Sequence, residues 1–182
     1  TLHNCVVYDN TPSQSNFGDC ALNYCCTFPL PSDGAGNFTN APLFLDELGS
    51  NFALQAGSPC INAGLNSYVS ETTDLDGRHR IVSSAVDVGA YEFQTPSSII
   101  SYAWLQQYGL PTNGSADCAD PDGDGMKNWQ EWIAGTNPTN TGSALRMLPI
   151  TNLASGLRLS WTSVTNQTYS LERATNLCGS PA

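Results

Sequence analysis

Basic residues are scarce in this chain. Lys and Arg together number six against 16 Asp and Glu, which gives a formal net charge of −10 at pH 7. A nucleic-acid backbone is bound by clustered cations that release its counterions, so six scattered cations exclude nucleic acid as a partner. Anionic membranes are disfavoured for the same reason, and no apolar run is long enough to span a membrane.

Charged residues of both signs are few, at 12% of the chain, which is too little for a helical protein held by ion pairs. The hydrophobic content of 40% supplies a core and excludes disorder. Asn, Thr and Ser are frequent, beside 16 Gly and 11 Pro, and these are residues of turns and strands. Composition therefore predicts an all-β fold. The acidity has two interpretations, which are solubility and a need for divalent cations.

No CxxC pair with a matching partner is present, which excludes an ordinary zinc site. An extracellular chain with this cysteine content is expected to hold one or two disulfides together with buried thiols, and the sequence leaves the pairing open. Cys25 and Cys26 are adjacent, so in extended chain they face opposite ways and at most one is expected to point into the core. The seven cysteines are Cys5, Cys20, Cys25, Cys26, Cys60, Cys118 and Cys178.

Residues 1–93 consist of short apolar segments separated by turns. Few stretches carry the amphipathic stripe of a helix. Many short strands at irregular spacing indicate a sandwich, a barrel or a solenoid, and composition does not choose among them. The apolar segments are 5–8, 42–45, 52–54, 60–62 and 86–93.

An ordered series of motifs in this half resembles a known family. It consists of Asn4 to Asn10, Gly36-Asn37, Ala41 to Phe44, Leu54 to Gly64, Asp74 to Gly77, Arg80 and Val86 to Phe93. Together these motifs resemble the C-terminal end of the bacterial choice-of-anchor Q proteins, which are large secreted or surface-attached solenoids. The resemblance implies that residues 1–93 are the last rungs and cap of a right-handed parallel β-helix, with further rungs before Thr1.

The remainder divides into three expected segments. Residues 94–98 are expected to be a linker. Residues 99–140 are expected to hold a short helix from Ile99 to Tyr108, stopped by Gly109, and a calcium loop. Residues 141–182 alternate in polarity at 157–161 and 168–173 and resemble the start of a fibronectin-III-like β-sandwich. Such a sandwich has about seven strands in about 100 residues, so the domain here is expected to be partial, either truncated or completed by another chain.

The segment from Asp120 to Glu131 has the spacing of an EF-hand-like calcium loop. Such a loop places oxygen donors at positions 1, 3, 5, 7, 9 and 12, with Gly at position 6 for the sharp turn. The predicted calcium ligands are the side chains of Asp120, Asp122, Asp124, Asn128 and Glu131 and the main-chain carbonyl of Met126, with Gly125 at the turn. A helix beginning near Asn128 would carry Glu131 back over the ion. Without a cation, carboxylates this close repel one another.

The calcium segment resembles dockerin-like and thrombospondin-type-3-like repeats. In these, the acidic loop is followed by a short helix and a Gly-Thr-Asn-Pro exit, which is 135–138 here. A dockerin proper pairs two such loops, whereas this chain has one. Asp117, three residues upstream, is an optional extra ligand.

A second set of carboxylates has the appearance of a glycosidase or lyase pair: Asp74, Asp76, Asp87 and Glu92. We favour a structural interpretation, in which Asp74 to Gly77 form a turn and Arg78 or Arg80 pairs with Asp87 or Glu92. No catalytic residue is assigned.

The sequence therefore predicts a secreted or cell-surface, calcium-binding protein with a structural or adhesive role. Its expected partners are a carbohydrate, another surface protein or a second copy of itself. The alternative is the C-terminal part of a carbohydrate-active enzyme whose catalytic rungs precede Thr1.

Overall fold

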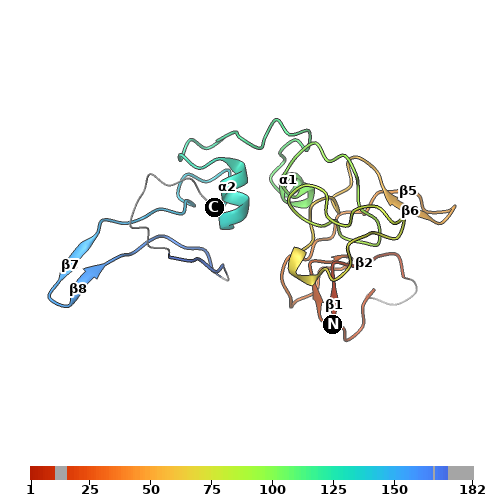
Figure 1. Ribbon diagram of the computed structural model, residues 1–182, viewed down its shortest axis with the longest axis horizontal. Coiled ribbons are helices and arrows are strands. Elements are labelled where there is room, and N and C mark those ends of the chain that lie inside the picture. The colour runs from red at the N-terminus through yellow and green to blue at the C-terminus, as the bar shows by residue number, and fades with distance from the viewer. Residues whose placement is uncertain (11–15, 166, 172–182) are drawn as a thin grey trace.

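The computed structural model describes residues 1–10, 16–165 and 167–171. Its regular elements are short and are joined by long irregular segments (Figure 1). In chain order they are β1 Leu2–His3, β2 Val6–Val7, β3 Leu22–Asn23, β4 Cys26–Thr27, β5 Phe44–Asp46, β6 Asn51–Leu54, the 3-10 helix η1 Asn66–Tyr68, α1 Tyr102–Gln107, α2 Asn128–Ala134, β7 Thr151–Leu153 and β8 Gly156–Arg158.

The strands form four separate two-stranded sheets. Two are parallel, β1 with β3 and β2 with β4, and their partners are 20 residues apart, as in Leu2 with Leu22 and Val6 with Cys26. The other two, β5 with β6 and β7 with β8, are antiparallel. In the described part of the chain, a single bridge between Cys26 and Phe38 extends the parallel stacking.

The prediction of an all-β fold made of β-helix rungs and a cap is therefore wrong. The described residues contain no closed or solenoid β-helix, and they include two α-helices. Each parallel ladder is two residues long because the chain turns at Asn4, Asp9 and Tyr24, whose φ angles of 51°, 52° and 53° end the extended conformation. Beyond β4, Pro29 and Pro31 lack the N–H that a continuing ladder needs.

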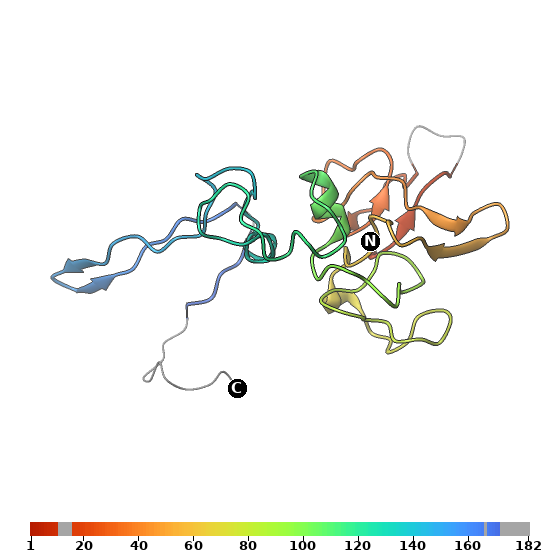
Figure 2. The same ribbon diagram turned by 90° about the horizontal axis from the view of Figure 1, so that it is seen from above.

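The predicted partial β-sandwich is also wrong for the described residues. One hairpin, β7–β8, extends away from the rest of the chain, and all its residues are exposed (Figure 2). Trp161 makes only an isolated bridge to Met147, and 168–171 carry no strand. Residues 172 and 173 of the predicted last strand lie outside the described residues. The apolar side chains of the hairpin have no second sheet to cover them.

The main core lies among residues of the first half and α1. Its buried members are Cys26, Leu54, Cys60, Ile61, Ala63, Val88 and Tyr102. Cys26 belongs to this core and Cys25, although fully buried, does not, in line with the expectation that at most one of the pair points into the core. Tyr102 brings α1 onto this core, and its main-chain N–H donates to the carbonyl of Ile61 at 3.1 Å.

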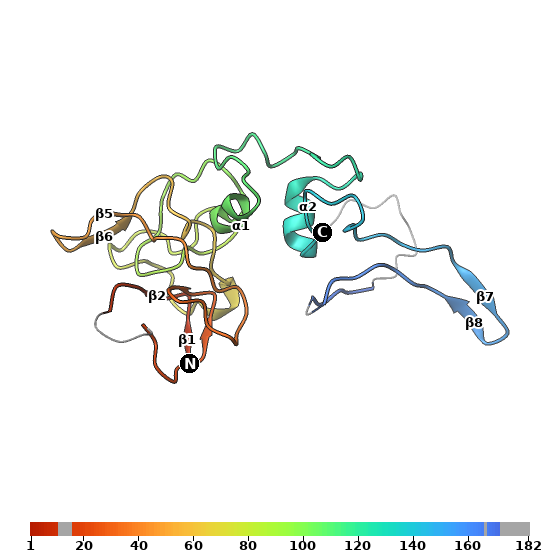
Figure 3. The same cartoon turned by 180° about the vertical axis from the view of Figure 1, so that it is seen from behind.

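A second, smaller core joins α1 to α2. Ile100, Leu105 and Ala116 are buried in it, and Trp129 and Trp132 of α2 pack against them. The N-terminus of α1 is capped by Ser101, whose hydroxyl accepts from the N–H of Trp104. The segment between the helices arches from one lobe of the molecule to the other, as the view from behind shows (Figure 3). The division of the chain at residues 93, 98 and 140 stays a prediction.

Close packing at Gly64 gives a first testable prediction. A Cβ there would lie 2.7 Å from Val86 Cγ1 and 2.9 Å from the Val86 carbonyl oxygen, whereas a Cβ at Gly57 would have nothing within 4 Å. We expect Gly64→Ala to lower the free energy of unfolding by about 1–3 kcal/mol, because the main chain at Val86 or at residue 64 must move to make room for the new methyl group. Gly57→Ala is the matched control and should change it by less than about 1 kcal/mol. Equal effects in urea unfolding would contradict this account of the packing.

Candidate metal centre

The acidic loop, residues 120–131, begins in the arching segment and ends in the first turn of α2, and Asp120 organises it. Its carboxylate accepts hydrogen bonds from the main-chain N–H groups of Gly123, Asp124 and Gly125 at 2.9, 3.2 and 3.0 Å. These bonds curl the chain around one side chain. Gly123 and Gly125, with φ of 74° and 96°, allow the tight turns that a residue with a Cβ would resist.

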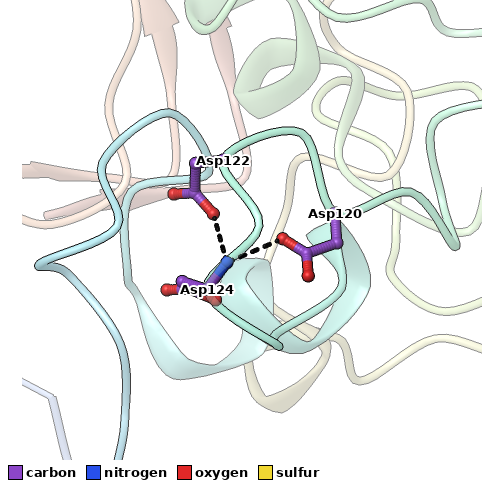
Figure 4. Close-up of side chains that lie close together, drawn as sticks. All are labelled: Asp120, Asp122 and Asp124. Carbon is purple, nitrogen blue, oxygen red and sulfur yellow. Dashed lines mark hydrogen bonds between the residues drawn. The ribbon is translucent and has the colours of Figure 1, made fainter.

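The curl brings three carboxylates together (Figure 4). Asp120, Asp122 and Asp124 each offer an oxygen within 4.8 Å of the others, and this group can hold a metal ion. The N–H of Asp124 donates to both other carboxylates, at 3.2 Å in each case. Among the residues that the structure describes, no other group of three His, Cys, Asp or Glu side chains is placed to share an ion.

Several side-chain oxygens in this loop are buried and accept no hydrogen bond. Seven buried side-chain nitrogen or oxygen atoms lack a hydrogen bond in the described part of the chain, and four of them belong to the loop. These four are Asp122 Oδ2, Asp124 Oδ2, Asn128 Oδ1 and Glu131 Oε2. Because a buried unpaired oxygen costs about 1–3 kcal/mol, and more when charged, such a concentration fits a cation site.

Glu131 has a raised pKa, and its surroundings explain why. It lies on α2, is fully buried, and only its Oε1 has a partner, the Thr136 hydroxyl at 3.3 Å. Burial is the largest cause that raises the pKa of Glu131 from 4.5 to about 7, and the charges of Asp122 and Asp124 add to it. A carboxylate held this way is stabilised by any cation that reaches it.

Among the described residues, one positive side chain from outside the loop forms an ion pair with it. The guanidinium of Arg146 lies 3.9 Å from Asp124 Oδ2 and donates to the Asp124 carbonyl at 2.8 Å. Its side chain is half exposed, so it neutralises little of the negative charge. Sequence reasoning missed Arg146, because nothing in a spacing of 22 residues indicates that contact.

The predicted ligands fall into two groups. Asp120, Asp122 and Asp124 meet, as their spacing requires, whereas Glu131 lies outside their 4.8 Å group. Asn128 is buried and its Nδ2 donates to the Ala116 carbonyl at 2.8 Å, which leaves Oδ1 unpaired. Ligation by Asn128, by Glu131 and by the Met126 carbonyl stays a prediction.

Asp117, the optional extra ligand, does not join the group. Its carboxylate accepts from the Ser98 hydroxyl at 2.6 Å and from the Ile99 N–H at 3.0 Å. Its main-chain carbonyl accepts from the N–H of Trp129 at 3.1 Å. Asp117 therefore ties the start of α2 to the segment that precedes α1.

Three of the second set of carboxylates, Asp74, Asp87 and Glu92, form a buried structural network, whereas Asp76 is exposed. Asp74 Oδ1 accepts from the N–H groups of Asp76 and Arg78 at 3.0 and 2.8 Å, which closes the predicted turn. The predicted ion pair is Arg80 with Glu92, at 3.0 Å. Asp87 accepts from two main-chain N–H groups, at 2.8 and 2.6 Å. Burial raises the pKa of Asp87 to about 7, with the charge of Glu92 adding to it.

This network does not present free catalytic carboxylates. Both oxygens of Glu92 accept hydrogen bonds, from Val82 at 2.9 Å and from Asp87 and Arg80 at 3.0 Å. Glu92 and Asp87 are almost fully buried. Their observed contacts are those that hold the segment 74–93 in place.

Comparison of the chain with protein-family models, with curated proteins and with solved structures found no match. Within the described residues, no helix has the length and apolar character needed to cross a membrane. The acidic loop is therefore interpreted from its own residues.

Proposed function

We propose that this chain is a calcium-binding structural protein of the extracellular space or cell surface, in which one Ca²⁺ ion stabilises the junction around the acidic loop. The observation that supports it most is the meeting of three aspartates in a loop that holds four buried oxygens without a hydrogen-bond partner, two of them on Asp122 and Asp124. The ligands would be the side chains of Asp120, Asp122, Asp124, Asn128 and Glu131 and the carbonyl of Met126.

Calcium is the ion that these donors suit best. All six are oxygens, and calcium takes six to eight oxygen ligands at about 2.3–2.6 Å in a flexible geometry. Magnesium requires a smaller octahedral site and keeps several waters, whereas zinc prefers nitrogen and sulfur. The carboxylates supply up to four negative charges against the single positive charge of the half-exposed Arg146. This charge balance favours a divalent cation.

The position of the loop gives the ion its proposed structural role. The loop ends in the first turn of α2, whose Trp129 and Trp132 pack on the second core. The N–H of Asn128 donates to the Ala119 carbonyl at 2.9 Å, which ties the start of α2 to the residue that precedes Asp120. An ion that fixes the loop would therefore fix the start of α2 against α1.

An extracellular location agrees with the proposed ion. Extracellular calcium modules bind at about 10⁻⁴–10⁻³ M, and calcium outside cells is in the millimolar range. The role would then be structural or adhesive, with a carbohydrate, another surface protein or a second copy of the chain as the partner class.

Calorimetric titration tests the ion. We expect one calcium per chain with a dissociation constant of about 10⁻⁴–10⁻³ M and at least about tenfold weaker magnesium binding. Asp124→Asn should weaken calcium binding by about tenfold or more, because it removes a charged ligand. The loop should keep its shape, since the amide oxygen can still accept from the Met126 N–H, which lies 2.7 Å from Asp124 Oδ1 in the parent chain. Asp76→Asn, at an exposed turn carboxylate, is the matched control and should leave the affinity unchanged. Calcium binding that Asp124→Asn leaves intact would contradict the proposed site.

A further inference from the structure

Two strands bring two cysteines to the same level of the molecule. In the sheet of β2 and β4, Val6 pairs with Cys26 in parallel, and the same offset of 20 residues holds in β1 and β3. Cys5 and Cys25 immediately precede these paired positions, and the Cys26 N–H donates to the Cys5 carbonyl at 3.0 Å. Neighbouring strands lie about 4.8 Å apart, inside the range of about 4.4–6.8 Å between Cα atoms that a disulfide requires.

The two side chains also meet. The six cysteines that the structure describes are free thiols, and those of Cys5 and Cys25 are hydrogen-bonded to each other. They differ in access. Cys25 is fully buried, whereas Cys5 is partly exposed and lines a cavity of about 590 Å³. A small reagent in this cavity would therefore reach the sulfur of Cys5 first.

The groups around Cys5 favour its thiolate. The hydrogen bond from Cys25 is the largest cause that lowers the pKa of Cys5 from 9.0 to about 6, burial opposes it, and the positive charge of Arg80 adds to the lowering. The same hydrogen bond, with burial, raises the pKa of Cys25. The other titratable side chains that line the cavity are those of His3, Tyr8, Glu47, Tyr68 and Glu71. The pair therefore has one reactive and one protonated member.

We propose that Cys5 and Cys25 form a disulfide that links the two parallel strands, with a small-molecule disulfide of the glutathione class as oxidant. The Cys5 thiolate attacks one sulfur of the oxidant, the sulfur–sulfur bond of the oxidant breaks, and one glutathione thiolate leaves. Cys25 then releases its proton to solvent and attacks Cys5 Sγ, which expels the second glutathione. The pair loses two electrons and one oxidised glutathione becomes two thiols.

A second thiol pair provides an internal comparison. Cys26 and Cys60 are also hydrogen-bonded to each other, but both are fully buried in the main core. An oxidant added to the folded chain has no route to either sulfur. In the folded protein this pair is expected to stay reduced while Cys5 and Cys25 are oxidised.

Peptide mapping distinguishes the pairs. Cleavage before aspartate puts Cys5 in fragment 1–8, Cys25 in 19–32 with Cys20 and Cys26, and Cys60 in 46–73. After reduction, desalting, exposure of the folded chain to oxidised glutathione at pH 7.5 and alkylation, we expect 1–8 linked to 19–32, with a mass about 2 Da below the sum of its parts. Sequencing the linked fragment in the mass spectrometer should place the bond on Cys25.

Matched variants of the adjacent cysteines sharpen the test. Cys25→Ser should abolish the link and leave glutathione attached to Cys5, whereas Cys26→Ser should keep the link. The rate at which iodoacetamide alkylates Cys5 in the reduced chain should rise through about pH 6. The midpoint of this rise should move to higher pH in Cys25→Ala, which has no side-chain donor at that position. The proposal is overturned if 19–32 is joined through Cys20 or Cys26, or if the exposed Cys20 and Cys118 react while Cys5 does not. The mapping of the unsubstituted chain decides the question even where a variant does not fold.

Discussion

Replacement of Arg80 by Met is expected to lower the free energy of unfolding by about 3–5 kcal/mol, because it leaves a buried carboxylate without its partner. Arg80 Nη1 lies 3.0 Å from Glu92 Oε2, and the side chains are 12% and 0% exposed. Arg80 also donates to the carbonyls of Asp87 and Gly89 at 3.2 and 2.7 Å. Met fills a similar volume, so the loss would report the charge and hydrogen bonds more than a cavity.

Arg78→Met is the matched control for this substitution. Arg78 pairs with Asp76 at 3.9 Å, and these side chains are 61% and 46% exposed, so its loss should cost at most about 1 kcal/mol. Both variants are compared by urea unfolding at constant calcium. Similar losses of unfolding free energy in the two variants would show that the buried ion pair stabilises the fold no more than the exposed one.

The pH dependence of Arg80→Met follows from Glu92. Burial is the largest cause that raises the pKa of Glu92 in the folded chain, and Arg80 opposes it. Without Arg80 the folded-state pKa rises further above the unfolded value of 4.5. The folded variant then binds a proton more readily than the unfolded chain, so its stability rises as the pH falls towards 4.5. The difference in the free energy of unfolding between Arg80→Met and the parent chain should therefore become smaller as the pH falls.

The acidic loop could be predicted because its interactions are local. Asp120, Asp122 and Asp124 are two residues apart, and the turn that gathers them depends on Gly125 and on N–H groups within five positions of Asp120. The start of α2 at Asn128 was predicted for the same reason and is confirmed. The pairing of Arg80 with Glu92 was one of four combinations that the sequence left open.

The fold could not be predicted in the same way, because the alternation of apolar residues indicates which face of a strand is buried but not which strand it pairs with. Val6 and Cys26 do pair in parallel, yet positive φ at Asn4 and Tyr24 limits each ladder to two residues. The alternation at 157–161 predicts a half-buried strand, but Leu157 is 69% exposed because no second sheet lies over it in the described residues. Resemblance of motifs indicated a regular solenoid where the chain forms irregular segments.

Replacement of Glu131 by Gln is expected to raise the stability of the calcium-free chain and to reduce the further stabilisation that calcium gives. In calcium-free buffer at pH 8, Gln should raise the free energy of unfolding by about 1–3 kcal/mol, because it removes a buried charge beside Asp122 and Asp124. The sign of this change follows from the pKa of Glu131, which is raised to about 7 in the folded chain. Above that pH the carboxyl is ionised and its charge destabilises the folded chain. The Gln side chain keeps the size of Glu and can still accept from the Thr136 hydroxyl.

With calcium the same substitution removes a proposed ligand that can bind through two oxygens, so affinity should fall by about tenfold or more. At ten times its dissociation constant, calcium stabilises the unsubstituted chain by about 1.4 kcal/mol, and the variant would lose most of this gain. Glu47→Gln, at an exposed carboxylate, is the matched control and should change neither quantity. Urea unfolding in chelator and in millimolar calcium measures both. A variant that is destabilised under both conditions would assign Glu131 to packing. A gain in chelator that shrinks by about 1 kcal/mol in calcium is the result expected if the charge of Glu131 repels its neighbours until a cation binds.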